Sequence, residues 1–465
     1  MTSRSLITAL AFAVGGCAMV GPDYQRPPIG LPADYAQAPA SPAPLALPAH
    51  WWRLYGDPTL DKLVASGLER NTDIKLAAAR IEEAEALLRE VNATLFFPLV
   101  EGRAAGSRAR SSTRTGTLPA SVPPIRNDFQ LTASTSFELD FWGRLRRTSE
   151  AVRAQLLGTR YGRDVVSLTL AASIAQTYFA VRSLDAQIIV SGETLKAAED
   201  SLDLARARAQ AGIVSDLDVY QANANRAQLA AQVKDLRRQR EVAVHQLGVL
   251  SGLLGVGLEA GDLRALPTPP LPPPGLPSSL LERRPDVRQA EAQLMAANAQ
   301  IGVAKAAQLP TFSLTGALGR ESQELGTLFA TGAGIWSLGL GVVGPIIDGG
   351  RYAARTEQAE ARARQAGVTY EKTAQTAFRE VADALSNVTL AAEAEQDLRD
   401  RVEQASNSLR LATLRYESGY SAYLEVLDAQ RTLNDAQLAL VRNRQSYLGY
   451  TVDLMNALGG GWTPY

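Results

Sequence analysis

Apolar and polar residues alternate strictly along residues 129–141, the segment FQLTASTSFELDF. A period of two predicts a β-strand with one mainly apolar face and one polar face. Weaker alternation occurs along residues 99–108, 311–315 and 336–342. The pattern therefore predicts two β-hairpins, at about 99–141 and 311–345. Their length suits strands that cross an outer membrane, although hairpins of a soluble β-sandwich would show the same alternation.

A different period governs the long proline-free stretches between Pro124 and Pro267 and between Pro345 and Pro464. Apolar residues recur there at spacings of three and four, which predicts α-helices with apolar stripes. We expect long helices at about 145–255 and 351–458, the first part of them reaching unbroken from Leu145 to about Gln210. At about 1.5 Å per residue such a helix is roughly 100 Å long, more than a globular domain needs. Two apolar stripes on one helix favour a wall of helices, although an ordinary buried helix remains the alternative.

The chain is a tandem repeat. Pro98 recurs as Pro310, 212 residues later, and Gly212 recurs as Gly419, 207 residues later, with neighbours that agree in type around both pairs. Each repeat is too long for a small solenoid unit and holds several elements. We place the first repeat at 59–266, a proline-rich linker at 267–277 and the second repeat at 278–465.

The N-terminus has the features of a bacterial lipoprotein signal. A short basic region and an apolar run lead to Val14, two glycines and Cys17, the one cysteine of the chain. We expect a signal peptide at 1–16, lipid modification of Cys17, and a proline-rich tether at 17–58. Ala18 favours the outer membrane, because no aspartate stands there as an inner-membrane signal. An ordinary secretory signal that ends near a cysteine is the alternative.

Four strands cannot close a barrel, and an open sheet edge in lipid leaves unpaired N–H and C=O groups at several kcal/mol each. Three copies would supply about twelve strands, an even number within the range known for outer-membrane barrels. The expected fold class is mainly α with membrane β. Each repeat gives a β-hairpin and long helices, and a homotrimer with a helical wall and a 12-stranded β mouth is the economical solution.

Composition and motifs exclude several classes of function. Lys plus Arg is 47 and Asp plus Glu is 48, so no net charge attracts nucleic acid. The two histidines, His50 and His245, and a single cysteine do not support a zinc site. Phosphate-binding and dinucleotide-binding motifs are missing from the sequence. We expect no enzyme, no cofactor, no metal and no nucleic-acid partner.

Several motifs, in order along nearly the whole chain, resemble the lipoprotein branch of the TolC-like outer-membrane factors, the OprM/NodT-type channels of multidrug efflux. They lie at residues 18–27 (AMVGPDYQRP), 51–63 (WWRLYGDPTLDKL), 139–146 (LDFWGRLR), 281–290 (LERRPDVRQA), 301–310 (IGVAKAAQLP), 344–351 (GPIIDGGR), 423–433 (YLEVLDAQRTL) and 457–462 (ALGGGW). The resemblance implies a trimeric outer-membrane channel, in which a 12-stranded β-barrel is continuous with a periplasmic α-helical barrel. It also implies a periplasmic adaptor and an inner-membrane pump as partners.

The resemblance further implies a gate at the periplasmic tip, at Leu424, Asp428 and Arg431. Residues spaced by four and three lie on one helical face, so a threefold axis would bring three copies of each side chain together. The first repeat has Leu217 but carries Gln221 and Ala224 at the two charged positions. A solvated charged face, with an Asp–Arg pair contributing a few tenths of a kcal/mol, is the alternative.

The expected function is a passive exit duct for small molecules, located in the outer membrane, anchored by lipid and gated at its periplasmic tip. Two alternatives remain open from the sequence. One is a duct for protein secretion, and the other is a periplasmic coiled-coil adaptor that forms no pore. The adaptor leaves the alternating segment 129–141 without an explanation.

Overall fold

The computed structural model describes residues 19–32, 35, 48–112, 114, 123–269 and 283–461. Cys17, the expected signal peptide, and parts of the expected tether and linker lie outside the described residues. The chain forms two compact units. One unit comprises Met1–Pro28, Ile81–Thr159 and Ala290–Tyr370, and the other comprises Ile29–Arg80, Arg160–Gln289 and Glu371–Tyr465. Each unit thus contains segments of both repeats.

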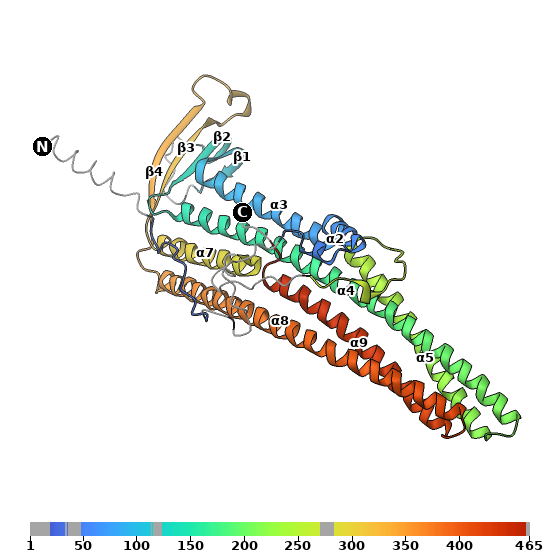
Figure 1. The fold of residues 1–465 in the computed structure, drawn as a ribbon. Coiled ribbons are helices and arrows are strands. Elements are labelled where there is room, and N and C mark those ends of the chain that lie inside the picture. The colour runs from blue at the N-terminus through green and yellow to red at the C-terminus, as the bar shows by residue number, and fades with distance from the viewer. Residues whose placement is uncertain are drawn as a thin grey trace. The chain divides into compact units, whose positions relative to one another are not determined.

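The first unit contains an antiparallel sheet in the order β1 (Leu99–Arg110), β2 (Ile125–Leu139), β3 (Thr311–Ser322) and β4 (Gly334–Val343), as Figure 1 shows. The short helix η3 (Leu325–Thr327) lies in the β3–β4 connection. Both predicted hairpins are confirmed. β2 pairs with β3, so the hairpin of one repeat continues directly into the hairpin of the other.

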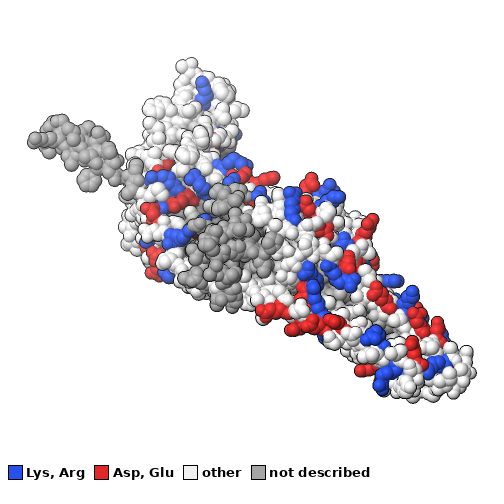
Figure 2. All heavy atoms as spheres, viewed as in Figure 1, with Lys and Arg blue, Asp and Glu red and all other residues white. Residues whose placement is uncertain are grey.

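One face of this sheet is apolar and exposed in the single chain. Leu131 of β2 and Leu318 of β3 are two residues apart in the β2–β3 register. Because paired residues share a face, both side chains lie on the same face of the sheet. Exposed apolar residues on that face are Val100, Leu131, Leu314, Leu318, Trp336, Leu338, Leu340 and Val342. On the face shown in Figure 2 the strands carry few charged side chains, while both signs of charge cover the helices. A broad exposed apolar face of this kind is what lipid would cover.

Two helices are very long. α4 (Arg144–Gln210) and α8 (Arg351–Glu417) each have 67 residues, and each is followed by a return helix, α5 (Asp216–Ser251) and α9 (Tyr423–Ala457). These bounds confirm the predicted unbroken helix from Leu145 to about Gln210. The shorter α-helices among the described residues are α2 (Pro58–Arg70), α3 (Thr72–Phe96) and α7 (Pro285–Ala306).

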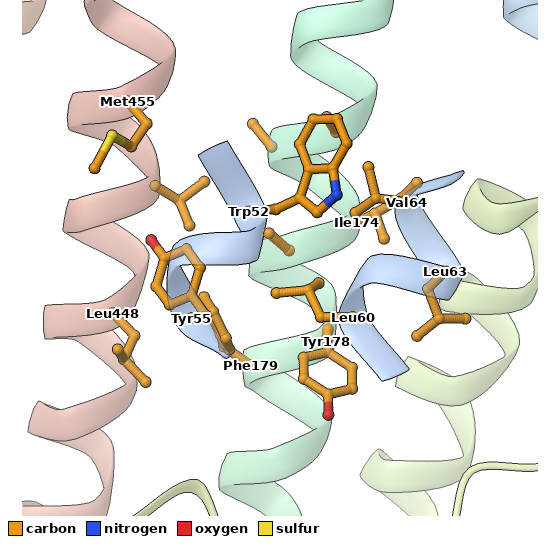
Figure 3. Packing of buried hydrophobic residues seen from close by; sticks show 14 of the residues in the cluster. Trp52, Tyr55, Leu60, Leu63, Val64, Ile174, Tyr178, Phe179, Leu448 and Met455 are labelled. Atoms are coloured by element: carbon orange, nitrogen blue, oxygen red, sulfur yellow. The ribbon is translucent and has the colours of Figure 1, made fainter. Parts of the chain in front are cut away.

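The second unit is organised around an aromatic core. Trp51 and Tyr55 of η1 (Trp51–Tyr55) are fully buried and belong to one cluster with Leu60, Tyr178 and Phe179. Figure 3 shows Tyr55 beside Phe179, together with Leu60 and Tyr178 of the same cluster. Asp57 caps α2 by accepting hydrogen bonds from the amides of Thr59 and Leu60, and the Tyr178 hydroxyl donates to its other oxygen. The WWRLYGDPTLDKL motif is therefore a structural core, and the short helix η2 (Leu263–Ala265) contributes Leu263 to it.

Candidate functional site at the helix tips

The turns that join each long helix to its return helix have the same backbone geometry. Gly212 ends α4 with φ 72° and Gly419 ends α8 with φ 78°, the left-handed conformation that glycine adopts without strain. The next amide bonds back five residues in both turns, from Ile213 to the Arg208 carbonyl at 2.9 Å and from Tyr420 to the Arg415 carbonyl at 2.8 Å. This pattern is a Schellman motif, and the 207-residue repeat therefore holds at the level of single hydrogen bonds.

The return helices begin differently. The Ser215 hydroxyl accepts a hydrogen bond from the Leu217 amide at 3.2 Å and caps α5. The matching residue before α9 is Ala422, which has no side-chain cap. α5 also has Asp216 and Asp218 in its first turn, where the positive end of the helix dipole favours carboxylates. α5 is thus stabilised at its start by local interactions that α9 lacks in part, since α9 has only Glu425 there.

A small apolar cluster anchors the start of α9 instead. Tyr423, 1% exposed, packs its ring 5.5 Å from that of Tyr416. Burial raises the pKa of both phenols, and the negative charge of Asp218 adds to the shift at Tyr416. The other buried members of the cluster come from α4, α5 and α9, and they are Leu202, Ala205, Ala222, Val426 and Leu427.

Arg208 of α4 locks the α8 end into the same cluster. Its guanidinium lies 4.7 Å from the centre of the Tyr416 ring and donates a 2.8 Å hydrogen bond to the Tyr416 carbonyl. The matching residue, Arg415, forms a 3.4 Å ion pair with Glu425 between two exposed side chains. The first repeat's arginine therefore holds the second repeat's turn, whereas the second repeat's arginine forms a surface pair.

The three predicted gate residues lie on one exposed face of α9. Leu424 is 58% exposed, and Asp428 and Arg431 are also exposed, while Val426 and Leu427 between them are buried. Among the described residues, neither charged side chain has an ion-pair partner. The face that the spacing predicts is present in the single chain, and its side chains are free to meet another surface.

The face continues to Asp435, which sequence reasoning did not single out. Asp435 is exposed and lies one turn beyond Arg431. Its counterpart in the first repeat is Gln228, so the first-repeat face stays neutral along its length while the second carries three charges. The spacing of four from Arg431 was the signal that could have identified it.

A buried polar chain links the helices behind this face. The Gln430 side-chain amide donates to the Ser201 hydroxyl at 3.1 Å, and the Asn225 amide donates to the Gln430 carbonyl oxygen at 3.4 Å. Three helices, α4, α5 and α9, are joined by these two bonds. Sequence reasoning missed them, because partners more than 200 residues apart leave no local pattern.

The junctions between strand and helix position the N-terminal segment. Asp140 accepts hydrogen bonds from the amides of Leu145 and Arg146 at 3.0 Å and so caps α4. Val20 donates from its amide to the Trp142 carbonyl at 3.0 Å. The Arg147 guanidinium, 3% exposed, reaches Asp23 at 2.7 Å and the carbonyls of residues 20 and 21. A buried cation thus holds the segment that follows Cys17.

The same segment is fixed at two further points. Gly21, with φ 103°, approaches Gly302 so closely that a β-carbon on it would lie 2.5 Å from the Gly302 α-carbon. Arg26 forms a two-point pair with Glu291 at 2.6 and 2.9 Å. We call residues 19–26 the strap.

The described residues contain no group of three or more His, Cys, Asp or Glu side chains that could hold a metal ion. Carboxylates at the tips instead pair with arginines or face outward, as on a solvated helical surface.

Comparisons with known proteins identify the family to which this chain is similar. The model of the outer membrane efflux protein family matches residues 63–253 and again residues 276–460. A toluene efflux pump outer membrane protein, TtgC of Pseudomonas putida, is 37% identical over 99% of this chain and 96% of its own length. A probable outer membrane lipoprotein, SilC of Salmonella typhimurium, is 31% identical over 99% of both chains.

A solved structure of the outer-membrane channel OprN superposes with a TM-score of 0.88 at 31% identity, covering 96% of this chain and all of the other. The double match confirms the two repeated halves, and nearly complete coverage in both directions excludes an adaptor that shares only the helices. The chain therefore belongs to the outer membrane efflux protein family of TolC-like proteins, and it is a non-enzymatic outer-membrane channel of an efflux system.

Proposed function

We propose that three copies of this chain form one continuous channel, which passively conducts small amphiphilic compounds through the outer membrane. The observation that carries the proposal is the four-stranded sheet. Its apolar face is exposed, and its outer strands β1 and β4 have no further strand partner among the described residues. Such edges are unfavourable in lipid unless other copies pair with them.

The sequence carries no nucleotide-binding motif, so the driving force would come from partners. We infer a periplasmic adaptor and an inner-membrane pump, which deliver compounds to the periplasmic end of the channel. Aromatic solvents are a suitable compound class, because TtgC is named for toluene efflux. Selectivity would then be set mainly by the pump, since the described helix tips present apolar packing and surface charges to their surroundings.

Lipid at Cys17 would anchor the channel, and the strap would set where the anchor lies. Met19, two residues after Cys17, is in contact with the junction, because a β-carbon on Gly143 would lie 2.8 Å from the Met19 side chain. Val20 is bonded to Trp142. Tryptophan favours the boundary between lipid and water. A lipid chain on Cys17 would therefore start close to the membrane surface.

The gate would form where Leu424, Asp428 and Arg431 of three chains converge. Leucine excludes water, and the charged pair can bond to neighbouring helices in the closed state. Opening would be a shift between two packings of the return helices, biased by contacts with the partner complex. The exposed, unpaired state of Asp428 and Arg431 in the single chain supports this assignment.

The pore is tested with protein purified from outer membranes. Native mass spectrometry should give a trimer, and reconstitution in planar bilayers should give discrete single-channel currents. Deletion of the gene should sensitise cells to aromatic solvents, and the protein should copurify with an adaptor and a pump. A monomer without single-channel current would contradict the proposal.

The gate is tested separately. The double variant Asp428→Ala/Arg431→Ala should increase the current through the reconstituted trimer, because both side chains hold the closed tip. Unchanged current in a correctly assembled trimer would contradict the assignment of these residues.

A further inference from the structure

Charged residues differ between the two faces of the four-stranded sheet. Paired residues share a face, so the strand register assigns each strand residue to one side. The face opposite the apolar one carries both signs of charge, at Glu101, Arg103, Arg126, Asp128, Glu138 and Glu321. On the apolar face, the charged residues of the described strands are all arginines, namely Arg108, Arg110 and Arg320. Conduction through the pore does not explain why one face carries one sign of charge.

The three arginines lie at the same end of the sheet. Helix α3 leads into β1 and α7 leads into β3, so both strands begin at the helices and run away from them. Arg110 is the last residue of β1, Arg108 stands two residues before it, and Arg320 stands two residues before the end of β3. In the proposed channel, on which the present inference rests, this end points to the cell exterior and the apolar face contacts lipid.

The length of β1 suits this placement. Val100, near the start of the strand on the apolar face, and Arg110 are ten residues apart. A rise of about 3.4 Å per residue and a strand tilt of about 40° separate them by roughly 26 Å across the membrane. The apolar band of an outer-membrane barrel is about 25 Å tall, and an arginine on its lipid face is strongly unfavourable at the midplane but nearly neutral at the boundary. Arg108 and Arg110 therefore fit the outer boundary, where the lipid headgroups lie.

Aromatic residues mark both boundaries of the same band. At the helix end, the ring centres of Phe141 and Phe312 are 4.8 Å apart, and the Trp142 ring lies 6.5 Å from that of Phe312. At the far end, Phe329 is 70% exposed, and the Arg320 guanidinium lies 5.6 Å from the centre of its ring. Aromatic side chains are enriched at both membrane–water boundaries. The position of Arg320 at the outer boundary is thus supported independently of strand length.

The two arginines of β1 are available to a ligand. Arg108 and Arg110 are exposed, and neither has an ion-pair partner among the described residues. The residues opposite them on β2 are Asn127 and Ile125, so the paired positions supply no carboxylate to neutralise them. Arg320 is partly engaged, because it donates a 3.4 Å hydrogen bond to a carbonyl of the β3–β4 connection. Two guanidinium groups on one face are therefore left to bind an anion.

The anion that the outer leaflet presents at this boundary is phosphate. The outer leaflet of a Gram-negative outer membrane consists mainly of lipopolysaccharide, whose lipid A joins several acyl chains to a phosphorylated sugar headgroup. Guanidinium groups bind phosphate oxygens in two-point geometry, which the ammonium group of lysine does not provide. Basic clusters at a membrane surface bind anionic headgroups in this way.

We propose that Arg108 and Arg110 bind a phosphate group of lipopolysaccharide on the outer wall of the channel, with Arg320 as a further contact on β3. The apolar strand surface between the arginines and the helix end then lies against the acyl chains of the same molecule. A phospholipid of the inner leaflet is excluded from this site, because its headgroup lies at the opposite boundary. Lipopolysaccharide bound to the assembled protein should stabilise the trimer, since a ligand favours the form that binds it.

The site is tested on trimers purified from outer membranes and stripped of lipid. Purified lipopolysaccharide is titrated while the temperature at which the trimer dissociates is measured, and native mass spectrometry counts the bound lipids. Arg108→Gln/Arg110→Gln removes both free guanidinium groups. Each arginine near an anionic surface strengthens binding about fivefold, so the double variant should need a roughly 30-fold higher lipopolysaccharide concentration for the same stabilisation.

The matched control is Arg103→Gln/Arg126→Gln, which removes the same charge from the opposite face of the sheet. Arg126 lies opposite Ala109, between the two proposed contacts along β1. We expect this control to respond to lipopolysaccharide as the unchanged protein does. An unchanged response in Arg108→Gln/Arg110→Gln, or an equal loss in the control, would overturn the site.

Lipid probes on the unchanged trimer keep the test independent of how the variants fold. Lipopolysaccharide should raise the dissociation temperature at a lower concentration than phosphatidylglycerol, and dephosphorylated lipopolysaccharide should lose most of this advantage. Equal effects of the phosphorylated and dephosphorylated forms would overturn the phosphate contact, and an equal effect of phosphatidylglycerol would overturn the choice of lipopolysaccharide. A monomer without single-channel current before lipid removal would instead overturn the proposed channel.

Discussion

The two helix tips share a backbone and differ in how their return helices begin. Both turns end in a left-handed glycine with the same hydrogen bonds. α5 then starts on a serine cap, while α9 starts on Ala422 and inserts the ring of Tyr423 into the cluster beneath it. The start of α5 has its own cap and first-turn carboxylates, whereas the start of α9 depends mainly on packing against neighbours. An element of the second kind can change state when its neighbours move.

The largest difference should appear at the first residue of each return helix. Tyr423→Ala removes a buried aromatic side chain and should cost about 3–5 kcal/mol of local stability, as large-to-small core substitutions do. Asp216→Ala, the matched change at an exposed position, should cost less than about 1 kcal/mol. Hydrogen exchange of the α9 and α5 amides measures both. Equal loss of protection in the two helices would remove the distinction.

The two matched arginines should differ next. Arg208→Ala removes a ring contact and a hydrogen bond to the Tyr416 carbonyl, and should destabilise the α8–α9 turn by about 2 kcal/mol. Arg415→Ala removes a surface ion pair and should cost at most about 1 kcal/mol. Proteolysis of the tip under native conditions compares the two. Faster cleavage in Arg415→Ala than in Arg208→Ala would contradict the cross-repeat role of Arg208.

Exchanging the caps should move the two helix starts toward each other. Ala422→Ser supplies the missing cap and should stabilise the start of α9 by about 1 kcal/mol. Ser215→Ala should destabilise the start of α5 by a similar amount. Hydrogen exchange in the first turn of each helix is again the measurement. No gain of protection in Ala422→Ser would show that the missing cap does not limit the stability of the first turn of α9.

The smallest expected difference between the repeats is in how their stability depends on pH. Burial raises the pKa of the Asp453 carboxyl above its usual value, and the Gln176 hydrogen bond only partly opposes this. An acid with a raised folded-state pKa binds more protons when folded, so its contribution to stability falls as pH rises from about 4 through that raised pKa. Asp453→Asn should remove this fall in acid titrations of unfolding. Gln246, the counterpart, has no titrating group and should add no such dependence when changed to alanine.

The sequence alone predicted the elements well, because the elements depend on local periodicity. Alternation along residues 129–141 predicted β2, and proline-free stretches predicted α4 and α8. The glycines that end these helices were also visible as repeated positions. Even the cap difference can be read directly, since Ser215 and Ala422 are matched residues.

Contacts between distant segments could not be predicted. The buried Arg147 that holds the strap, and the Arg208–Tyr416 contact, join residues whose partners lie far away along the chain. The repeat boundaries in the sequence also do not indicate that each compact unit contains segments of both repeats. Each unit contains both because the paired hairpins and the long helices place equivalent parts of the two repeats together. The role of Asp428 and Arg431 remains a prediction.

The central claim is that the charged face of α9, and not its neutral counterpart on α5, holds the channel closed. The direct measurement is the single-channel current of two exchanged trimers. Asp428→Gln/Arg431→Ala gives the second repeat the residues of the first and should increase the current severalfold. Gln221→Asp/Ala224→Arg gives the first repeat the residues of the second and should leave the current at or below its original level. An unchanged current in the first exchange, or an increase only in the second, would contradict the claim.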